Sequence, residues 1–435
     1  MASTYLTRQI TSAGSRKKAT ISLWVKRGSG FGNDQRWFSY ENTSASTNVT
    51  VFKFSGDSIQ FADQTGGSNN ARYDGTRKLR DPNAFYHFLV KMDTTQATNT
   101  DRLKIYINGE LQSEASYTYP SQNADLNIGH NSNAYIDIGR WRTNNNQYFD
   151  GLITHFHYTD GYAYDASTFG ETDSTSGIWK PKTAPSVTYG TNGFFLKFEN
   201  SGAMGTDSSG NTNTFTTSGT LTQNVDTPTN NFCTMNPLHK GANNALTNGN
   251  LTCTGSGTYT TVCSTLAVNS GKWYWEAKCN SASPSNYFNV GIIKTDTRID
   301  NLSYPADSGS SGYVYAIDGN MYYNGSSHLN TGTTVSVGDI VGFILDLDAG
   351  TLKLKKNGSD VYSGNAVVSS LNTGDFWYVT QGANPSNVDF NFGQGFFGTS
   401  AVASSNSDGA GLGLFEHSVP SGYYALCTKN IKDYG

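Results

Sequence analysis

Short segments in which apolar and polar residues alternate recur along the chain and limit what it can fold into. Residues 20–26 (TISLWVK) and 103–107 (LKIYI) bring every second apolar side chain to the same side of an extended backbone. This is the period of a β-strand that buries one face. Two such segments end in Asn-Gly, at residues 108–109 and 357–358. Because Asn and Gly accept the positive φ angles of a type I′ turn, both pairs predict β-hairpins.

The composition also favours strands over helices. The chain has 26 tyrosines and 23 phenylalanines, which suit the half-buried surface of a sheet, and 47 glycines, which suit tight turns. Runs rich in Ala, Leu, Glu and Lys are absent, so we expect little helix. A length of 435 residues exceeds one ordinary domain of roughly 150 residues. We therefore expect an all-β protein of two tandem antiparallel β-sandwiches.

One stretch interrupts the rhythm of strands and sets the expected domain boundaries. Residues 201–231 are dominated by Gly, Ser, Thr, Asn and Asp, which predicts a polar linker. We therefore predict a first sandwich at residues 1–200 and a second sandwich at residues 232–397. Residues 398–435 form a Gly/Ser-rich C-terminal tail, and its apolar segment 423–428 predicts a short strand that docks on another element.

The charge pattern argues against several kinds of partner. The formal net charge is −4, and the densest basic runs, at residues 16–18 and 353–356, predict solvated surfaces. We therefore expect no nucleic-acid partner. No stretch approaches the roughly 20 apolar residues of a membrane span, so we expect no membrane insertion. Residues 1–10 lack the apolar core of a secretory signal, which predicts a chain made in a cytosol and held in an assembly.

The cysteines give no metal pattern. Their number is odd and no two have C-x-x-C spacing, so we expect no zinc site. They are Cys233, Cys253, Cys263, Cys279 and Cys427. We expect buried thiols, with one disulfide as the alternative.

The first half of the chain resembles a known β-sandwich family. The segments that carry the resemblance are 22–26 (SLWVK), 86–88 (YHF), 105–109 (IYING) and 149–153 (FDGLI). They are similar to a laminin-G (LamG) or concanavalin-like jelly roll, over roughly residues 1–200. This resemblance implies the same sandwich architecture that the strand pattern predicts.

The second half resembles a different sandwich family, the SPRY domain. Its segments are 271–276 (GKWYWE), 338–342 (GDIVG), 345–348 (LDLD) and 391–393 (NFG). Together they span residues 271–393. The resemblance implies a second antiparallel β-sandwich.

The pairing of the two domains is more specific than either alone. Segments 169–173, 177–181, 205–211 and 226–232 resemble the connector of a LamG–SPRY family encoded largely by tailed bacteriophages of marine bacteria. Members of that family are generally virion structural components, often tail or surface proteins. The resemblance implies a location on the virion and other virion proteins as partners. It also implies a homo-oligomer, with a trimer favoured.

Concanavalin-like folds also include glycoside hydrolases, which need two carboxylates about 5 Å apart. Glu110, Gln112 and Glu114 have strand spacing, but the middle acid of the hydrolase pattern is missing. Asp346 and Asp348 share a strand face but belong to the SPRY-like segment. A glycan-active hydrolase is therefore the weakest alternative, and we expect no enzymatic activity and no catalytic residue.

Metal ligands are equally sparse. His155 and His157 share one strand face and could form half of a metal site, but no third ligand lies near them in the sequence. LamG-type domains often hold calcium through loop acids, and Asp34, Asp63 and Asp101 are acids of this type. We expect no cofactor and no assigned metal site, and a structural calcium ion stays as an unassigned alternative.

Aromatic residues in polar loops are the best candidates for a binding site. Rings can pack on the C–H faces of sugars, and Tyr, Trp and Arg anchor many protein interfaces. The candidates are Arg140, Trp141 and Arg142 in the first half and Tyr304, Tyr313, Tyr322 and Tyr323 in the second. The alternative is that these rings pack on the sandwiches themselves or between subunits.

Two functional hypotheses therefore remain. In the first, the chain is a tail-fibre or adhesin-type virion protein whose sandwich loops bind a glycan or protein on the host surface. In the second, it is a capsid or tail decoration protein that mainly contacts other virion proteins. The sequence does not separate the two.

Overall fold

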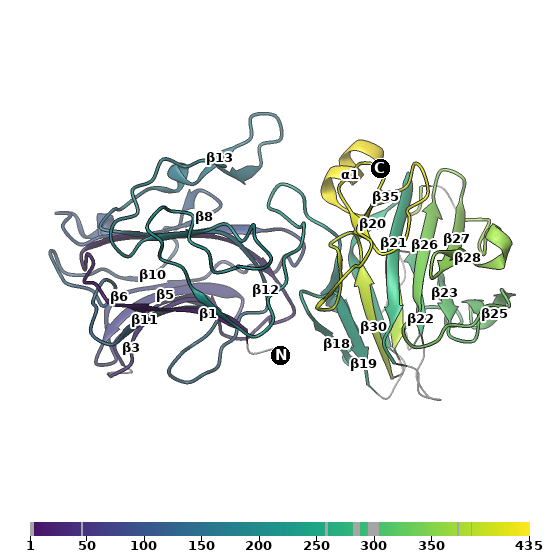
Figure 1. Ribbon diagram of the computed structural model, residues 1–435, viewed down its shortest axis with the longest axis horizontal. Coiled ribbons are helices and arrows are strands. Elements are labelled where there is room, and N and C mark those ends of the chain that lie inside the picture. Colours follow the sequence, from purple (N-terminus) through teal and green to yellow (C-terminus); the bar gives the residue numbers. More distant parts are fainter. Residues whose placement is uncertain are drawn as a thin grey trace. The chain divides into compact units, whose positions relative to one another are not determined.

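The computed structural model describes residues 4–44, 47–256, 260–281, 288–294, 304–371, 374–383 and 385–435. The chain divides into two compact units, Met1–Gln223 and Asn224–Gly435 (Figure 1). Each unit contains two large sheets that are antiparallel except at one short strand described below. The sequence-based prediction of a nearly all-β chain with two tandem sandwiches is confirmed.

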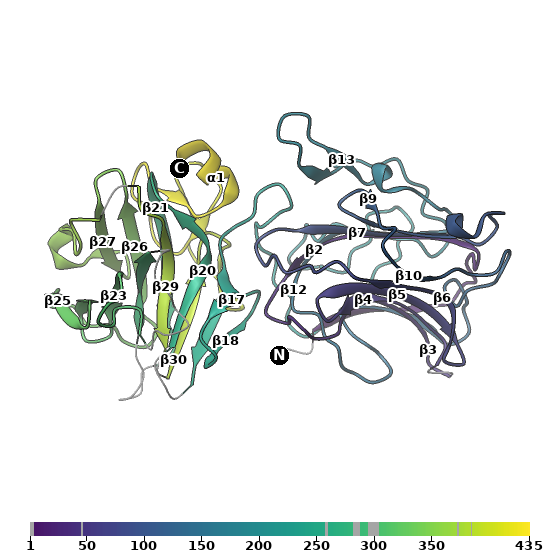
Figure 2. The same cartoon turned by 180° about the vertical axis from the view of Figure 1, so that it is seen from behind.

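Unit 1 is a sandwich of an eight-stranded and a six-stranded sheet, which Figure 2 shows as two layers. The eight-stranded sheet has the order β10 (Ala115–Thr118), β6 (Ser68–Gly75), β5 (Ser58–Thr65), β4 (Val49–Ser55), β3 (Gln35–Asn42), β11 (Ala134–Ile138), β1 (Tyr5–Ile10) and β16 (Thr216–Ser218). The six-stranded sheet has the order β15 (Phe194–Leu196), β12 (Gly151–Asp160), β2 (Lys18–Arg27), β7 (Tyr86–Asp93), β8 (Leu103–Ile107) and β9 (Glu110–Leu111).

An aromatic cluster fills the space between these two sheets. The indole of Trp37 is fully buried and stacks on Phe88 with ring centroids 4.7 Å apart. Phe52 and Phe54 meet the same indole edge-on, at 4.9 and 4.5 Å. Burying a side chain of this size stabilises a fold by roughly 1.5–3 kcal/mol, so this cluster is a major part of the core of unit 1.

The turn after β8 follows the sequence-based prediction. Asn108 and Gly109 have φ angles of 50° and 81°, and they join β8 to β9. Asn357 and Gly358 have φ angles of 50° and 80° and form the equivalent turn in unit 2. Both predicted hairpins are therefore confirmed.

A second layer of chain covers the outer face of the six-stranded sheet. It contains the short helix η2 (Ala166–Thr168) and the hairpin of β13 (Gly170–Thr172) and β14 (Trp179–Pro181). Leu89 of β7 packs there against Phe169 and Trp179. Beside them lies His87, which is fully buried. This covering segment therefore forms a second apolar layer on the sheet, and it shields His87 from solvent.

Unit 2 repeats the sandwich plan with a seven-stranded and an eight-stranded sheet. The seven-stranded sheet has the order β17 (Met235–Lys240), β20 (Thr260–Val268), β29 (Trp377–Ala383), β22 (Asn289–Lys294), β23 (Gly312–Ala316), β24 (Asn320–Tyr323) and β25 (Ser326–Asn330). The main path of the other sheet is β18 (Asn244–Thr247), β19 (Thr252–Gly255), β30 (Ser386–Asn391), β21 (Lys272–Cys279), β26 (Ile340–Asp346), β27 (Thr351–Lys356) and β28 (Ser359–Asp360), with one further strand paired to β21. In the core between them, Trp275 stacks on Phe343 with centroids 5.1 Å apart.

The C-terminal segment lies across the outer face of the second of these sheets. It contains β31 (Phe396–Phe397), β32 (Ser400–Ala401), β33 (Asn406–Ser407), β34 (Leu414–Phe415), β35 (Tyr424–Ala425) and the helix α1 (Thr428–Tyr434). Strand β35 pairs in parallel with β21, and Figure 1 shows this yellow segment beside β21. Tyr274 and Ile344 of the sheet pack against Phe415 of the segment. The tail is therefore docked on the sheet through β35 and Phe415.

Two buried carboxylates fix this C-terminal segment, Glu276 from the sheet and Asp408 from within the segment itself. Glu276 on β21 accepts hydrogen bonds from the backbone N–H groups of Glu416 and His417, at 2.9 and 2.8 Å. Asp408 accepts from the N–H groups of Leu412 and Ala425, both at 2.8 Å. Burial raises the pKa of Glu276, and these backbone donors partly offset that shift. The carboxylates thus accept hydrogen bonds from backbone N–H groups of the segment that have no partner in a neighbouring strand.

Residues 201–231, which the composition predicts to be a linker, are divided between the two units. In unit 1, β16 pairs with β1, and Asp207 accepts a hydrogen bond from the N–H of Phe195 at 2.9 Å. Asn213 donates to the carbonyl oxygens of Thr191 and Gly193. Polar residues that composition alone would place in solvent are thus used to satisfy the backbone of neighbouring segments.

The five cysteines are free thiols, and all are buried. The expectation of buried thiols is confirmed, and the alternative of one disulfide is wrong. In the part of the chain that the structure describes, no helix has the length and apolar character needed to cross a bilayer.

We predict that Asp408→Ala destabilises unit 2 by about 3 kcal/mol, because it leaves several buried donors without an acceptor. Denaturant unfolding of the whole chain, followed by a probe in unit 2, measures this loss. Asp433→Ala changes an exposed acid of α1 and serves as the control, with an expected loss below about 0.5 kcal/mol. Equal effects of the two substitutions would contradict the assigned role of Asp408.

A second prediction concerns acid stability. Burial lowers the pKa of His87 to about 3, and its Nδ1 accepts a hydrogen bond from the indole N–H of Trp179 at 3.0 Å. The folded state therefore keeps this ring neutral while the unfolded chain takes up a proton below about pH 6.5. The stability that this site contributes is complete above pH 6.5 and falls as the pH drops toward 3, by up to about 1.4 kcal/mol per pH unit.

Urea unfolding of unit 1 between pH 7.5 and 4.5 tests this prediction. The slope of the unfolding free energy against pH reports how many more protons the unfolded chain binds than the folded one. His87→Gln should lower this number by nearly one. His328→Gln, in unit 2, should leave the slope for unit 1 unchanged. An unaltered slope in His87→Gln would show that His87 does not control this pH dependence.

Candidate binding site

The loop that carries Arg140, Trp141 and Arg142 follows β11 on unit 1. Arg140 is 8% exposed, and its Nε lies 2.6 Å from Oδ2 of Asp137. Arg142 bonds the other oxygen of the same carboxylate at 3.1 Å. Trp141 packs under the guanidinium of Arg36, which lies 4.0 Å from the ring centroid. The structure thus places all three predicted residues in one internal network.

Two acids that the sequence analysis did not single out hold this loop. Asp137 and Glu41 are each 1% exposed. Glu41 accepts hydrogen bonds from the N–H groups of Arg142 and Thr143, at 3.0 and 3.1 Å. The signal in the sequence was an acid within an otherwise apolar alternating segment. Such an acid is buried only when paired. The partner of Asp137 is only three residues away, at Arg140, whereas the partners of Glu41 lie about 100 residues further along the chain.

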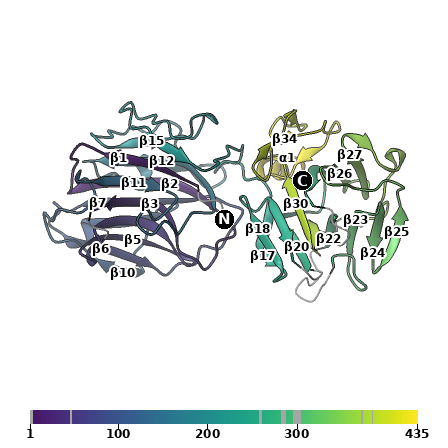
Figure 3. The ribbon, with the colours of Figure 1, turned by 60° about the horizontal axis from the view of Figure 1, so that its bottom comes forward.

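The four predicted tyrosines of unit 2 form two clusters. Tyr313 on β23 lies opposite Tyr323 on β24, and their rings stack with centroids 4.3 Å apart. His328 of β25 meets Tyr313 edge-on at 5.6 Å, and Trp377 lies 6.3 Å from Tyr313. We call these four residues the Tyr313 cluster. It packs against the core of the sandwich, near the edge of the sheet that Figure 3 shows at β24 and β25.

Tyr304 and Tyr322 belong to a second cluster, on the other face of the same sheet. Tyr322 is the neighbour of Tyr323 along β24, and successive residues of a strand point to opposite faces. Its hydroxyl donates to Oδ2 of Asp318 at 2.7 Å, and the amide of Asn320 donates to the same oxygen at 2.8 Å. The ring of Tyr304 lies 6.5 Å from that of Tyr322, at 75°. We call these four residues the Asp318 cluster.

The Asp318 cluster combines an ionised acceptor with aromatic surface. Burial alone would raise the pKa of Asp318, but the hydrogen bonds from Tyr322 and Asn320 hold it below its usual value. The hydrogen bond to Asp318, together with burial, raises the pKa of Tyr322, so this phenol stays protonated. Asp318 is exposed, and both tyrosines are half-buried. The cluster therefore offers a carboxylate, an amide and a phenol beside two rings.

The candidate catalytic glutamates do not share a strand. Glu110 lies on the two-residue strand β9, is exposed and pairs with Arg77 at 3.2 Å. Glu114 lies beyond the end of β9 and before β10, and it is also exposed. The strand alternation that would bring the two carboxylates to one face therefore stops at Leu111.

The two histidines considered as half of a metal site pack against aromatic residues. His157 is 2% exposed, bonds the hydroxyl of Tyr189 at 2.9 Å and stacks on Phe195. His155 has a positive φ of 47° and lies at a bulge in the pairing of β12 with β2. Both histidine rings lie near Phe195, with centroids 6.1 and 3.8 Å from its ring, so neither ring is free on the surface. Among the described residues, no group of three or more His, Cys, Asp or Glu has a metal-binding arrangement.

The three acids considered for calcium lie apart from one another. Asp34 pairs with Lys53 and Asp101 pairs with Lys104. Asp63 lies on β5 and not on a loop, and it accepts hydrogen bonds from Thr50 and from the N–H of Asn127. Each carboxylate therefore already has a partner within the protein.

The sequence was compared with models of known families. The model of the concanavalin A-like lectin/glucanases superfamily matches residues 2–163. The model of the SPRY domain matches residues 272–395. The chain therefore carries a concanavalin A-like domain followed by a SPRY domain. No curated protein gives a significant match to the chain.

Solved structures similar to parts of the chain include SPRY domains and a pentraxin. The SPRY domain of human HERC1 is 20% identical, with a TM-score of 0.31, over 36% of this chain and 96% of that one. The SAP-like pentraxin of Limulus polyphemus is 13% identical, with a TM-score of 0.28, over 36% of this chain and 69% of that one. The PSpry domain of TRIM65 is 13% identical, with a TM-score of 0.30, over 37% of this chain and 88% of that one.

We predict that Asp137→Ala destabilises unit 1 by about 3–5 kcal/mol, because it leaves two guanidinium groups without their buried partner. Hydrogen exchange should also show faster exchange in residues 139–148. Asp125→Ala removes an exposed acid of the same unit and serves as the control. A loss below about 0.5 kcal/mol in Asp137→Ala would contradict the assigned network.

Proposed function

We propose that this chain is a non-catalytic binding protein of the adhesin type. In this proposal it is a bacteriophage virion component, and its SPRY domain binds a glycan or protein on the host surface. The contact is made by the face of the seven-stranded sheet that carries the Asp318 cluster. The homo-oligomer, with a trimer favoured, and the contacts with other virion proteins belong to the same proposal.

The observation that carries the proposal is the geometry of the Asp318 cluster. Tyr322 and Asn320 both donate to Asp318, so the carboxylate is fixed in place while it stays exposed. A fixed acceptor beside aromatic surface suits a ligand that has both hydroxyl or amide donors and an apolar face. Because these groups are already ordered, little side-chain entropy is lost on binding.

The two types of domain support a binding role over a catalytic one. Concanavalin A-like and SPRY domains are typically interaction domains. In unit 1 the candidate carboxylates Glu110 and Glu114 lie at different places beyond the β8–β9 turn. The virion setting is supported by the resemblance of the connector segments to phage LamG–SPRY proteins.

The arginine loop of unit 1 has a different part in this proposal. The guanidinium groups of Arg140 and Arg142 lie over the rings of Tyr5 and Tyr135, at 3.4 and 3.8 Å from their centroids. Their charges are already paired with Asp137. We therefore assign this loop to the stability of unit 1, and host recognition to unit 2.

Binding to host cells tests the proposal directly. We expect Asp318→Asn and Tyr322→Ala to weaken binding of the purified chain to host envelope by at least about tenfold, as for residues at the centre of an interface. Tyr362→Ala removes an exposed tyrosine elsewhere in unit 2 and is the matched control. A glycan array then separates sugars from protein receptors.

Two results would contradict the proposal. One is a chain that does not bind host envelope at all, and the other is equal binding by the parent and both cluster variants. Imaging of intact particles gives an independent answer. The adhesin proposal expects the chain at an exposed site of the tail. A chain found only between other structural proteins, with both tyrosine clusters covered, would instead favour the decoration protein.

A further inference from the structure

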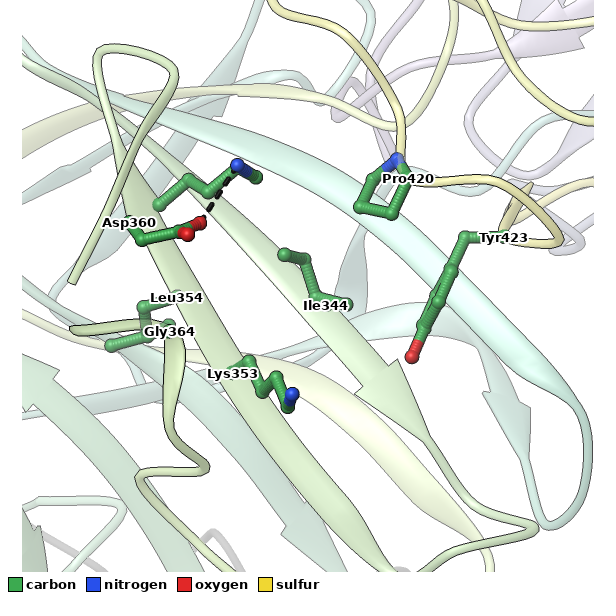
Figure 4. Close-up of a pocket in the computed structure, with 8 residues that line it drawn as sticks. Ile344, Lys353, Leu354, Asp360, Gly364, Pro420 and Tyr423 are labelled. Atoms are coloured by element: carbon green, nitrogen blue, oxygen red, sulfur yellow. Dashed lines mark hydrogen bonds and ion pairs between the residues drawn. The ribbon is translucent and has the colours of Figure 1, made fainter. Parts of the chain in front are cut away.

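A groove of about 250 Å³ lies on the outer face of the eight-stranded sheet of unit 2, where the C-terminal segment passes β26 and β27. Pro420 and Tyr423 of that segment line one side, and Lys353 and Asp360 line the other (Figure 4). Ile344 lies between the two sides. The groove is therefore built from sheet residues and from the C-terminal segment together.

The charges around the groove are paired except for one. Lys355 pairs with Asp360 at 2.8 Å, and Lys272 pairs with Asp346 at 3.0 Å. Lys353 has no carboxylate within ion-pair distance among the residues that the structure describes. It lies on the same face of β27 as Lys355, with one residue between them. The groove therefore has one unpaired ammonium group.

The apolar part of the groove is a planar ring beside a proline. The ring of Tyr423 is half-buried, and its hydroxyl bonds the carboxylate of Asp346 at 3.4 Å. This bond helps to fix the ring as one wall. The negative face of an aromatic ring attracts the C–H groups of a sugar. Lys355 and Asp360 add a donor and an acceptor for hydroxyl groups at the other end.

The groove is poorly suited to an extended peptide. It lies over the middle of β26 and β27, where Ile344 and Lys353 are paired in the sheet. A peptide that adds to a sheet needs a free strand edge for its main-chain hydrogen bonds. The volume is also below the roughly 300–1,000 Å³ of sites for drug-sized ligands. A ligand the size of one sugar ring suits this volume and needs no free strand edge.

We infer that this groove binds a single acidic sugar residue, a uronic acid, with its carboxylate on Lys353 and its C–H face on Tyr423. Hydroxyl groups of the sugar bond Lys355 and Asp360. The site lies on a different sheet from the Asp318 cluster and does not depend on the function proposed for that cluster. It would let one domain bind two parts of an acidic polysaccharide, or an acidic and a neutral glycan.

Titration of the whole chain with galacturonic acid and with galactose, followed by saturation-transfer NMR, tests this inference. The two sugars have the same ring and differ in the carboxylate. We expect galacturonic acid to bind at least about fivefold more tightly. Lys353→Gln should remove this preference. Lys353→Arg should keep most of it, because lysine and arginine side chains both pair with carboxylates.

Lys356→Gln is the matched control. Lys356 is on the same strand but pairs with Asp339 at 3.4 Å, away from the groove. Tyr423→Leu should weaken both sugars, because it removes the ring but keeps apolar bulk. Circular dichroism and the unfolding temperature of each variant show that the fold is retained.

Three results would overturn the inference. They are equal binding of galactose and galacturonic acid, unchanged binding in Lys353→Gln, and loss of binding in Lys356→Gln that matches that in Lys353→Gln. A short glutamate-rich peptide is a further probe. If the peptide displaces galacturonic acid at equal concentration, the groove recognises acidic peptides and the assignment to a sugar is wrong.

Discussion

Buried carboxylates that accept hydrogen bonds from backbone N–H groups or from arginine side chains hold the surface segments on both sandwiches. In unit 1, Glu41 and Asp137 hold the loop that follows β11. In unit 2, Glu276 of the sheet binds the C-terminal segment, and Asp408 of that segment joins Leu412 to Ala425 within it. Burying a charge costs several kcal/mol unless it is well paired, so these segments and their acids form or separate together. The groove of unit 2 depends on this arrangement, because Pro420 and Tyr423 belong to the segment that these acids hold.

Much of the fold can be predicted from the sequence. The alternating segments at residues 20–26 and 103–107 become the buried strands β2 and β8. The Asn-Gly pairs become hairpin turns because only a few residues accept their φ angles. These are local properties, and a local pattern is sufficient to predict them. The apolar segment of the tail was also recognised, since its length and character suit a docked strand.

The site was harder to predict, for a physical reason. Tyr322 and Tyr323 are neighbours in the sequence but point to opposite faces of the sheet. Grouping by position in the sequence therefore placed in one candidate site two tyrosines that belong to the Asp318 cluster and the Tyr313 cluster. His157 reads as a surface histidine, yet segments far away in the chain bring Tyr189 and Phe195 to it. Glu41 and Glu276 likewise act through partners that are 101 and 140 residues away in the sequence and that only the folded chain brings near. Long-range contacts of this kind leave no mark in the local sequence.

In the proposed function, unit 2 is the binding domain, and its two sheets carry different chemistry. The seven-stranded sheet carries a fixed carboxylate beside aromatic rings, and the other sheet carries an unpaired lysine beside Tyr423. Unit 1 has a different character, because its arginine loop is occupied by internal pairs. A ligand that contacts the chain should therefore protect unit 2 first, and the pattern of protection identifies the surface.

Hydrogen exchange of the purified chain, with and without host envelope, shows which unit contacts the host surface. If unit 2 binds through the Asp318 cluster, exchange slows in β23, β24 and the turn between them, at residues 312–323, and unit 1 is unchanged. Protection confined to unit 1, or no protection anywhere in unit 2, would contradict this binding mode.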